Sequence, residues 1–161
     1  MGRAAHARAL QIQSESLQSE SARLLIAALN AELAALYPEP GTNHFKLDAA
    51  EVEPGKGVFL VGYRDATAVA CGAMRRLETG VAEIKRMYVA PAARGQGVSK
   101  VMLAALEAHA RRLKVTRLVL ETGTRQPEAL ALYRRAGFNF IPCFGEYVGS
   151  DLSLCMGKDL A

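Results

Sequence analysis

The chain is predicted to fold as one α/β domain in which a mixed sheet carries helices on both faces. Its 161 residues, half of them apolar, are enough for one hydrophobic core and too few for two comfortable ones. The apolar pattern changes several times between a period of two and a period near 3.6. Strands and helices alternate in only part of the chain. We therefore expect a disordered tail at 1–8 and a single domain over 9–161.

The first third of the chain predicts a strand, a long helix and a long loop. Apolar and polar residues alternate over 9–14, which is typical of a half-buried strand. Ser19 can cap the helix that follows, and Pro38 ends it. The apolar stripe of this helix consists of leucines at helical spacing: Leu25, Leu29, Leu33 and Leu36. Residues 38–57 are rich in Pro and Gly and predict a loop with one short helix, of the kind that often borders a binding site.

The rest of the chain predicts four further strands and two helices before a closing strand pair. The strands are expected at 58–63, 68–76, 81–89, 117–121 and 152–156, the last paired with 138–141. Between them, residues 97–113 place apolar side chains on one helical face. A shorter helix is opened by Pro127 and closed by Gly137, the usual asymmetry of helix ends.

Charge and cysteine content narrow the function classes. The net charge of +4 comes with clustered basic residues, which suit solvated faces or a polyanionic small ligand. The absence of a basic tract and the 6% aromatic content disfavour a nucleic-acid surface. Three widely spaced cysteines in apolar surroundings predict buried thiols in a reducing compartment, and without a His/Cys ligand cluster we expect no metal. No apolar run has the length of a membrane span, so we expect a cytoplasmic protein without a membrane partner.

Residues 83–99, EIKRMYVAPAARGQGVS, form the most informative segment. An apolar strand ends at Pro91, and a short basic turn with two glycines leads into an amphipathic helix. A helix start of this kind offers unpaired backbone N–H groups and a positive dipole end, which together bind a pyrophosphate. The P-loop spacing is absent, and a dinucleotide fingerprint would need glycine where Lys100 stands.

The turn has the pattern Arg94-x-x-Gly97-x-Ser99, which resembles the R/Q-x-x-G-x-G/A signature of the GNAT superfamily of acyl-CoA-dependent N-acyltransferases. About thirty residues later, ALALYRRAGF at 129–138 resembles the family's A-x-x-L-Y-x-x-x-G-F segment. The two motifs stand in the family's order and cover roughly 81–140. The resemblance implies a mostly antiparallel sheet that splays open between its fourth and fifth strands, and acetyl-CoA as co-substrate.

The resemblance also implies which residues bind acetyl-CoA. Backbone groups late in the fourth strand would pair with the pantetheine amides, and the turn and helix start would hold the pyrophosphate. The implied set is Met87, Val89, Arg94, Gly95, Gln96, Gly97, Val98, Ser99, Lys100 and Gln126. Two of these depart from the family pattern: Ser99 replaces a small Gly or Ala and can add a hydroxyl donor, and Gln126 stands where Asn is frequent.

The strand at 81–89 is unusually polar in its middle, where Glu83, Lys85 and Arg86 stand. A central strand covered on both faces should be nearly all apolar. An exposed sheet edge would explain the charges, and so would a strand that lines a polar cleft. The resemblance favours the cleft.

Acetylation of an amine requires deprotonation of the amine, stabilisation of the thioester oxyanion and protonation of the leaving thiolate. By resemblance, Glu83 is the general base, acting directly or through water, and Tyr133 is the proton donor to the thiolate. The backbone N–H near Met87 would stabilise the oxyanion. Without the motifs, Glu83 would be interpreted as a solvated strand residue and Tyr133 as a core residue.

These observations predict an N-acetyltransferase that moves an acetyl group from acetyl-CoA to a primary amine of a small molecule. The alternatives are a protein N-terminal or lysine acetyltransferase, a non-catalytic acyl-CoA-binding sensor, and a nucleotide- or nucleic-acid-binding module. Loops around 37–57 and 141–151 carry aromatic residues and predict an enclosed pocket for a compact amine, one that can bear a carboxylate. Tyr147 is a candidate wall of this pocket and His44 a candidate acceptor contact, whereas His109 fits a core position. The sequence leaves a homodimer open.

Overall fold

The computed structural model describes residues 9–40 and 47–160. The predicted tail at 1–8 and the loop residue His44 lie outside these ranges.

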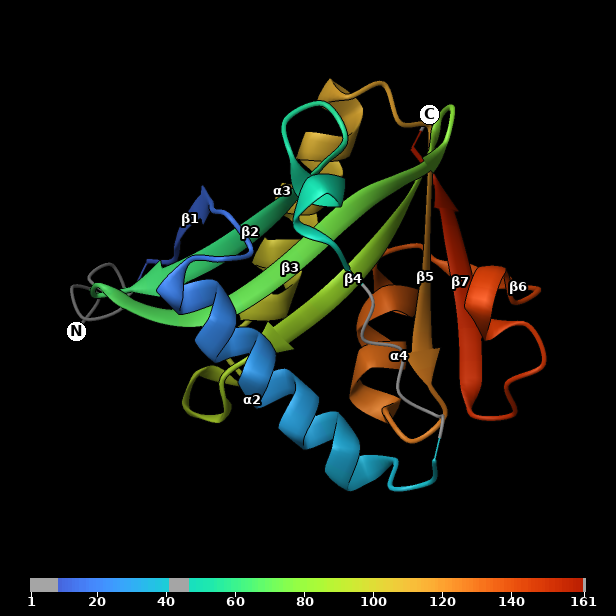
Figure 1. The fold of residues 1–161 in the computed structure, drawn as a ribbon, viewed down its shortest axis with the longest axis horizontal. Helices are drawn as coiled ribbons and strands as arrows, with labels where there is room; N and C mark the ends of the chain where they lie inside the picture. The colour runs from blue at the N-terminus through green and yellow to red at the C-terminus, as the bar shows by residue number, and fades with distance from the viewer. Residues whose placement is uncertain (1–8, 41–46, 161) are drawn as a thin grey trace.

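Within the described residues, seven strands form one sheet in the order β1-β2-β3-β4-β5-β7-β6 (Figure 1). The strands are β1 (Gln11–Ser14), β2 (Gly57–Arg64), β3 (Thr67–Glu78), β4 (Val81–Val89), β5 (Arg117–Gly123), β6 (Asn139–Ile141) and β7 (Ser153–Asp159). The α-helices are α2 (Glu20–Leu36), α3 (Val98–Arg112) and α4 (Pro127–Arg135), and the short 3-10 helices are η1 (Ala49–Val52), η2 (Pro91–Ala93) and η3 (Gly145–Tyr147). β4 and β5 are parallel, and the other neighbouring strands are antiparallel, which confirms the predicted mixed sheet.

The helix ends follow from the capping residues that the sequence indicated. The Ser19 hydroxyl accepts a hydrogen bond from the backbone N–H of Ala22 at 3.1 Å and so caps α2. Gly137 adopts a φ of +97° just after α4, a conformation that favours glycine at a helix end. The last strand is longer than predicted and runs to Asp159, because β5 offers it a pairing partner along its whole length.

Two apolar cores lie on opposite faces of the sheet. One core joins the sheet to α3 and α4, and its fully buried members include Met74, Met102 and Leu118. The other joins the sheet to α2 through residues such as Leu25 and Phe59. Figure 1 shows α2 crossing one face of β3 and β4 while α3 lies behind the sheet. Helices therefore cover both faces, as the sequence predicted.

The sheet opens between β4 and β5. Their pairing runs only from Val81 opposite Arg117 to Ile84 opposite Leu120, although both strands continue beyond it. A register irregularity between β3 and β4 follows, and Arg86 within it has a φ of +59°. Bulges of this kind bend a strand and redirect its side chains. The predicted splay is confirmed, and the exposed-edge explanation for the polar residues of β4 is wrong, because β4 lies between β3 and β5.

Candidate active site

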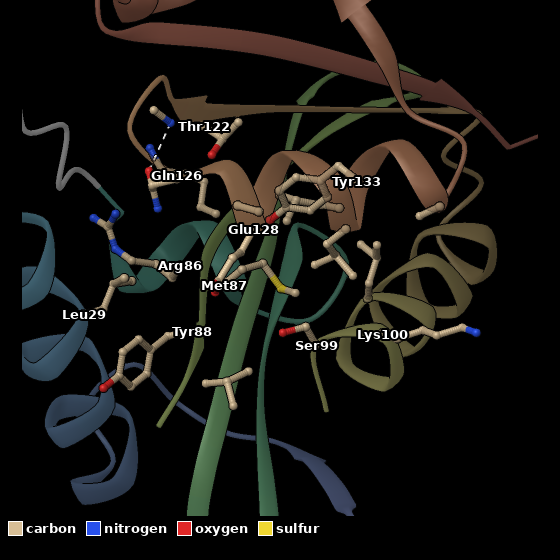
Figure 2. Close-up of a pocket in the computed structure, with 18 of the residues that line it drawn as sticks. Leu29, Arg86, Met87, Tyr88, Ser99, Lys100, Thr122, Gln126, Glu128 and Tyr133 are labelled. Atoms are coloured by element: carbon tan, nitrogen blue, oxygen red, sulfur yellow. Dashed lines mark hydrogen bonds between the residues drawn. The ribbon is translucent and has the colours of Figure 1, made fainter. Parts of the chain in front are cut away.

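A cleft of about 1040 Å³ occupies the opening between β4 and β5 (Figure 2). Its walls come from α2, the second half of β4, the turn before α3, α3, the end of β5, α4, and residues of η3 and around β7. Such a volume is large enough for an extended cofactor arm and a compact second substrate. The two segments that carry the sequence motifs, the turn before α3 and helix α4, therefore both line this cleft.

At one end of the cleft, the turn before α3 presents backbone rather than side chains. Gly95 and Gly97 have φ values of +76° and +77°, and a Cβ built on either would meet nothing within 4 Å. Gly97 is the N-cap of α3, and the buried side chain of Val98 anchors the helix start in the core. Ser99 and Lys100 follow on the cleft side (Figure 2). The first N–H groups of a helix have no acceptor within the helix, so this end can bind an anion.

The Arg94 guanidinium holds the turn in place. Its Nε donates to the main-chain oxygen of Val89 at 2.9 Å, and its Nη2 donates to Glu32 of α2 at 2.7 Å. The hydrogen bond to Glu32 raises the pKa of Arg94. The Arg94 side chain thus links the turn to the end of β4 and to α2. Arg94 also lines the cleft. Gln96 directs its side chain to the main-chain oxygen of Ala92 and to Arg64.

The late part of β4 has one strand neighbour among the described residues. Tyr88 and Val89 pair with β3, whereas the pairing with β5 stops at Ile84. Met87 and Val89 both line the cleft. The backbone edge that faces β5 can therefore accept a peptide-like partner, as an added strand does.

Gln126 has a structural task of its own. Its Oε1 accepts a hydrogen bond from the backbone N–H of Gly123 at 3.0 Å, the bond drawn dashed in Figure 2. This bond closes the turn between β5 and α4, and Gln126 lines the cleft beside it.

Tyr133 projects from α4 into the cleft (Figure 2). Its side chain is buried and packs edge-on against the Phe138 ring, with centroids 5.7 Å apart. Burial, and to a lesser extent the charge of Glu121, raise the pKa of Tyr133 above its ordinary value. The phenol stays protonated at neutral pH, which a proton donor requires.

Glu83 lies behind the wall of the cleft rather than on it. Only 1% of Glu83 is exposed, and Arg75 donates to its Oε1 from Nε at 3.1 Å and from Nη2 at 3.0 Å. The Tyr147 hydroxyl donates to its Oε2 at 2.7 Å, and the Lys85 ammonium donates to the Tyr147 oxygen at 3.3 Å. Tyr147 and Lys85 line the cleft. Tyr147 therefore connects Glu83 to the cleft.

The sequence analysis missed Arg75 and underrated Tyr147. Arg75 is the cross-strand partner of Glu83 in the β3–β4 hairpin, so extending the hairpin register would have found it. Burial, and then the charge of Glu83, raise the pKa of Tyr147. No local pattern marks Tyr147, because its contact with Glu83 joins residues 64 positions apart.

Glu121 is a second carboxylate that the sequence analysis did not single out. It lines the cleft from β5, one residue beyond the last residue that pairs with β4. Ser153 donates from its hydroxyl to Glu121 Oε2 at 2.7 Å. The charge of Glu121 contributes to the raised pKa values of Tyr133 and Tyr147. The alternation of side chains along β5 could have indicated this position: Leu118 and Leu120 point into one core, so Glu121 points to the other face of the sheet.

His109, the cysteines and the acidic side chains outside the cleft give no sign of a further reactive centre in the part of the chain that the structure describes. His109 lies on α3 with its Nδ1 2.8 Å from Arg112, and burial lowers its pKa. Within residues 9–40 and 47–160, no group of three or more His, Cys, Asp or Glu side chains is placed to hold a metal ion. No helix in the same part of the chain is long and apolar enough to cross a membrane. The three cysteines carry free thiols.

Comparison with known proteins decides the family. Residues 22–138 match the model of the acetyltransferase (GNAT) family. The chain belongs to the GNAT family. It is an acyl-CoA-dependent N-acetyltransferase.

Individual relatives of this GNAT enzyme extend over nearly all of its length. An IAA acetyltransferase of Azospirillum brasilense is 39% identical over 150 residues, which are 92% of this chain and 97% of that protein. A crystal structure from Klebsiella pneumoniae, assigned as an acyl-CoA N-acyltransferase, has a TM-score of 0.82 and 35% identity and covers 94% of this chain and 98% of its own. The yncA structure from Salmonella typhimurium, solved with its cofactor acetyl-CoA, has a TM-score of 0.68 at 19% identity, with 95% of each chain covered. This last likeness supports the fold alone.

Proposed function

We propose that the enzyme transfers an acetyl group from acetyl-CoA directly to the primary amine of a small molecule. The observation that carries this proposal is that the start of α3, the part of β4 that no longer pairs with β5, and Tyr133 all line one cleft. The turn with Gly95 and Gly97 would hold the pyrophosphate, and the backbone of Met87 and Val89 the pantetheine arm. The Azospirillum relative, named IAA acetyltransferase, supports an acetyl group as the transferred unit.

In this proposal Tyr133 is the acid and Glu83 is the base, acting through Tyr147. The amine passes a proton to the Tyr147 oxygen while the Tyr147 proton moves to Glu83 Oε2, 2.7 Å away. The Lys85 ammonium, 3.3 Å from the Tyr147 oxygen, would stabilise negative charge on it during the transfer.

The heavy-atom steps follow from the same arrangement. The amine nitrogen bonds to the thioester carbon, the backbone N–H near Met87 stabilises the oxyanion, the C–S bond breaks and the thiolate takes a proton from Tyr133. An acceptor that enters as an ammonium ion loses two protons and the thiolate gains one, so one proton is released overall.

The acceptor class is tested by the release of free CoA from acetyl-CoA in the presence of a panel of amines. We expect saturable release with small primary amines and none with spermidine or a lysine-rich peptide, because cationic side chains outnumber acidic ones in the lining of the cleft and repel a polycation. Saturation with spermidine or the peptide, and with no small amine, would favour a protein acetyltransferase. Tight acetyl-CoA binding without release for any acceptor would favour a sensor.

Glu83→Gln is expected to lower kcat/KM by about 100-fold at pH 7, the usual contribution of a general base. The loss should shrink as the pH rises through the pKa of the amine, because free amine then forms without help. Tyr147→Phe should give the same pH-dependent loss if the two residues act in one path.

The exposed Glu78 on β3 offers a matched control, and Glu78→Gln should retain wild-type kinetics. Because Glu83→Gln also removes the ion pair with Arg75, its thermal unfolding must be compared with that of the wild type. A loss of activity that does not vary with pH would assign Glu83 to positioning the strand.

A further inference from the structure

The two strands that separate at the cleft present charged groups on the same face of the sheet. Ile84 and Leu120, the last pair of β4 and β5, both point into the core under α3 and α4. Side chains alternate along a strand, so Lys85 and Glu121, which come next, both point to the α2 face. On this face of the sheet, away from α4, Tyr37 and Tyr147 also line the cleft.

Glu121 lines the cleft that also holds the two tyrosines proposed to act on the reacting groups, Tyr133 and Tyr147, and Tyr37 lines this one cleft as well. The hydrogen bond from Ser153 fixes the orientation of the Glu121 carboxylate. A carboxylate that lines the same cleft as Tyr133 and Tyr147 is placed to contact an ammonium group that must meet the thioester.

Arg86 brings a positive charge to β4, the strand that lies across the opening from Glu121 on β5. The bulge of β4 and the φ of +59° direct its side chain out of the ladder, and Figure 2 shows it reaching toward the turn that carries Gln126. Burial lowers the pKa of Arg86, yet a guanidinium keeps its charge. Non-glycine residues rarely adopt a positive φ, and such backbone strain is concentrated at functional sites.

The geometry points to an acceptor that carries both an amine and a carboxylate, with Glu121 contacting the amine and Arg86 the carboxylate. This inference rests on the proposed function and names the substrate class of the same cleft. A guanidinium matches a carboxylate with two parallel N–H donors, which an ammonium cannot do. Lys85 suits this contact less well, because it is buried against Tyr147 and Glu146.

Arg125, another cation at this end, is engaged elsewhere. It forms a bidentate pair with Glu39, at 2.9 and 2.5 Å, and lies over the Tyr37 ring. These contacts tie the end of α2 to the turn after β5. Arg125 therefore stabilises the connection between these two segments, and the carboxylate contact is assigned to Arg86.

The test compares amino acids with the amines that lack only their carboxylate. The pairs are L-phenylalanine with phenethylamine, L-tyrosine with tyramine and L-methionine with 3-(methylthio)propylamine, each at equal concentrations of unprotonated amine. In at least one pair, we expect kcat/KM for the amino acid to exceed that for the amine by about 10- to 100-fold, the effect of one charge-assisted contact. Equal or faster acetylation of the amine in every reactive pair overturns the inference.

Variants then locate the two contacts. Arg86→Met should bring the ratio within each pair close to one, and Arg86→Lys should keep part of the preference. The exposed Arg134, outside the cleft on α4, provides the control variant Arg134→Met, which should keep the wild-type ratio. Glu121→Gln should raise KM for both members of a pair.

The outcomes separate this inference from the function on which it rests. If Arg86→Met lowers both members of a pair alike, Arg86 holds the bulge and does not bind a carboxylate. If Glu121→Gln leaves KM unchanged, the amine does not contact Glu121. If no member of the panel releases CoA although calorimetry shows acetyl-CoA binding, the proposed function itself fails.

Discussion

Gly97→Val is expected to abolish detectable acetyl-CoA binding while the protein remains folded. Gly97 has a φ of +77°, a conformation that β-branched residues rarely adopt, so valine should rearrange the turn that presents the backbone N–H groups. A Cβ at this position meets no protein atom within 4 Å, so the core is not disturbed. The space that it would enter is where the phosphates are proposed to approach. Isothermal titration calorimetry with acetyl-CoA gives the readout.

Two further variants separate loss of the site from general strain. Gly55 has a φ of +87° and equally open surroundings, but it lies in the loop before β2, away from the cleft. Gly55→Val should therefore suffer comparable backbone strain and still bind acetyl-CoA. Gly97→Asn should retain the left-handed turn, since Asn tolerates it, and weaken binding by occupying the open space. Unchanged affinity in Gly97→Val would remove the pyrophosphate assignment.

Tyr133→Phe is expected to reduce turnover by about 10- to 1000-fold and to leave acetyl-CoA affinity near that of the wild type. The ring would keep its edge-on contact with Phe138, so only the hydroxyl is lost. An acid must be protonated to act, so its contribution disappears as the pH rises through its pKa. Because that pKa is raised above the ordinary value of 10, the wild-type basic limb assigned to Tyr133 should lie above pH 10 and vanish in the variant.

The matched control is Tyr63, a tyrosine on β2 that does not line the cleft. Tyr63 donates a hydrogen bond to Glu15 and lies 3.0 Å from the Ser21 hydroxyl, so Tyr63→Phe should affect stability more than turnover. Steady-state rates and pH profiles of both variants provide the comparison. Wild-type turnover in Tyr133→Phe would reduce Tyr133 to a packing residue.

Local sequence determined the elements and the anion-binding turn of this protein. The period of the apolar residues depends on neighbours two to four positions apart, so it survives without the fold and places strands and helices within a few residues. Ser19 and Gly137 mark helix ends because capping is likewise local. The motifs around Gly97 and Tyr133 predicted the family, and the family resemblance in turn predicted the opening between β4 and β5.

Only the tertiary structure decided what each charged side chain contacts. The sequence predicted Glu83 as a base through its resemblance to the family, but it could not show that Arg75 and Tyr147 enclose Glu83, nor that Glu121 lines the cleft. The Arg94 guanidinium likewise proved to bind Val89 and Glu32 of its own chain.

These contacts join residues that are remote in sequence, such as Glu83 and Tyr147, 64 positions apart. They form only once β3, β4 and β5 have assembled into one sheet and the segment before β7 has packed against it. The burial of a charge, its partners and its access to the cleft follow from that assembly, whereas the pattern of neighbouring residues does not encode them.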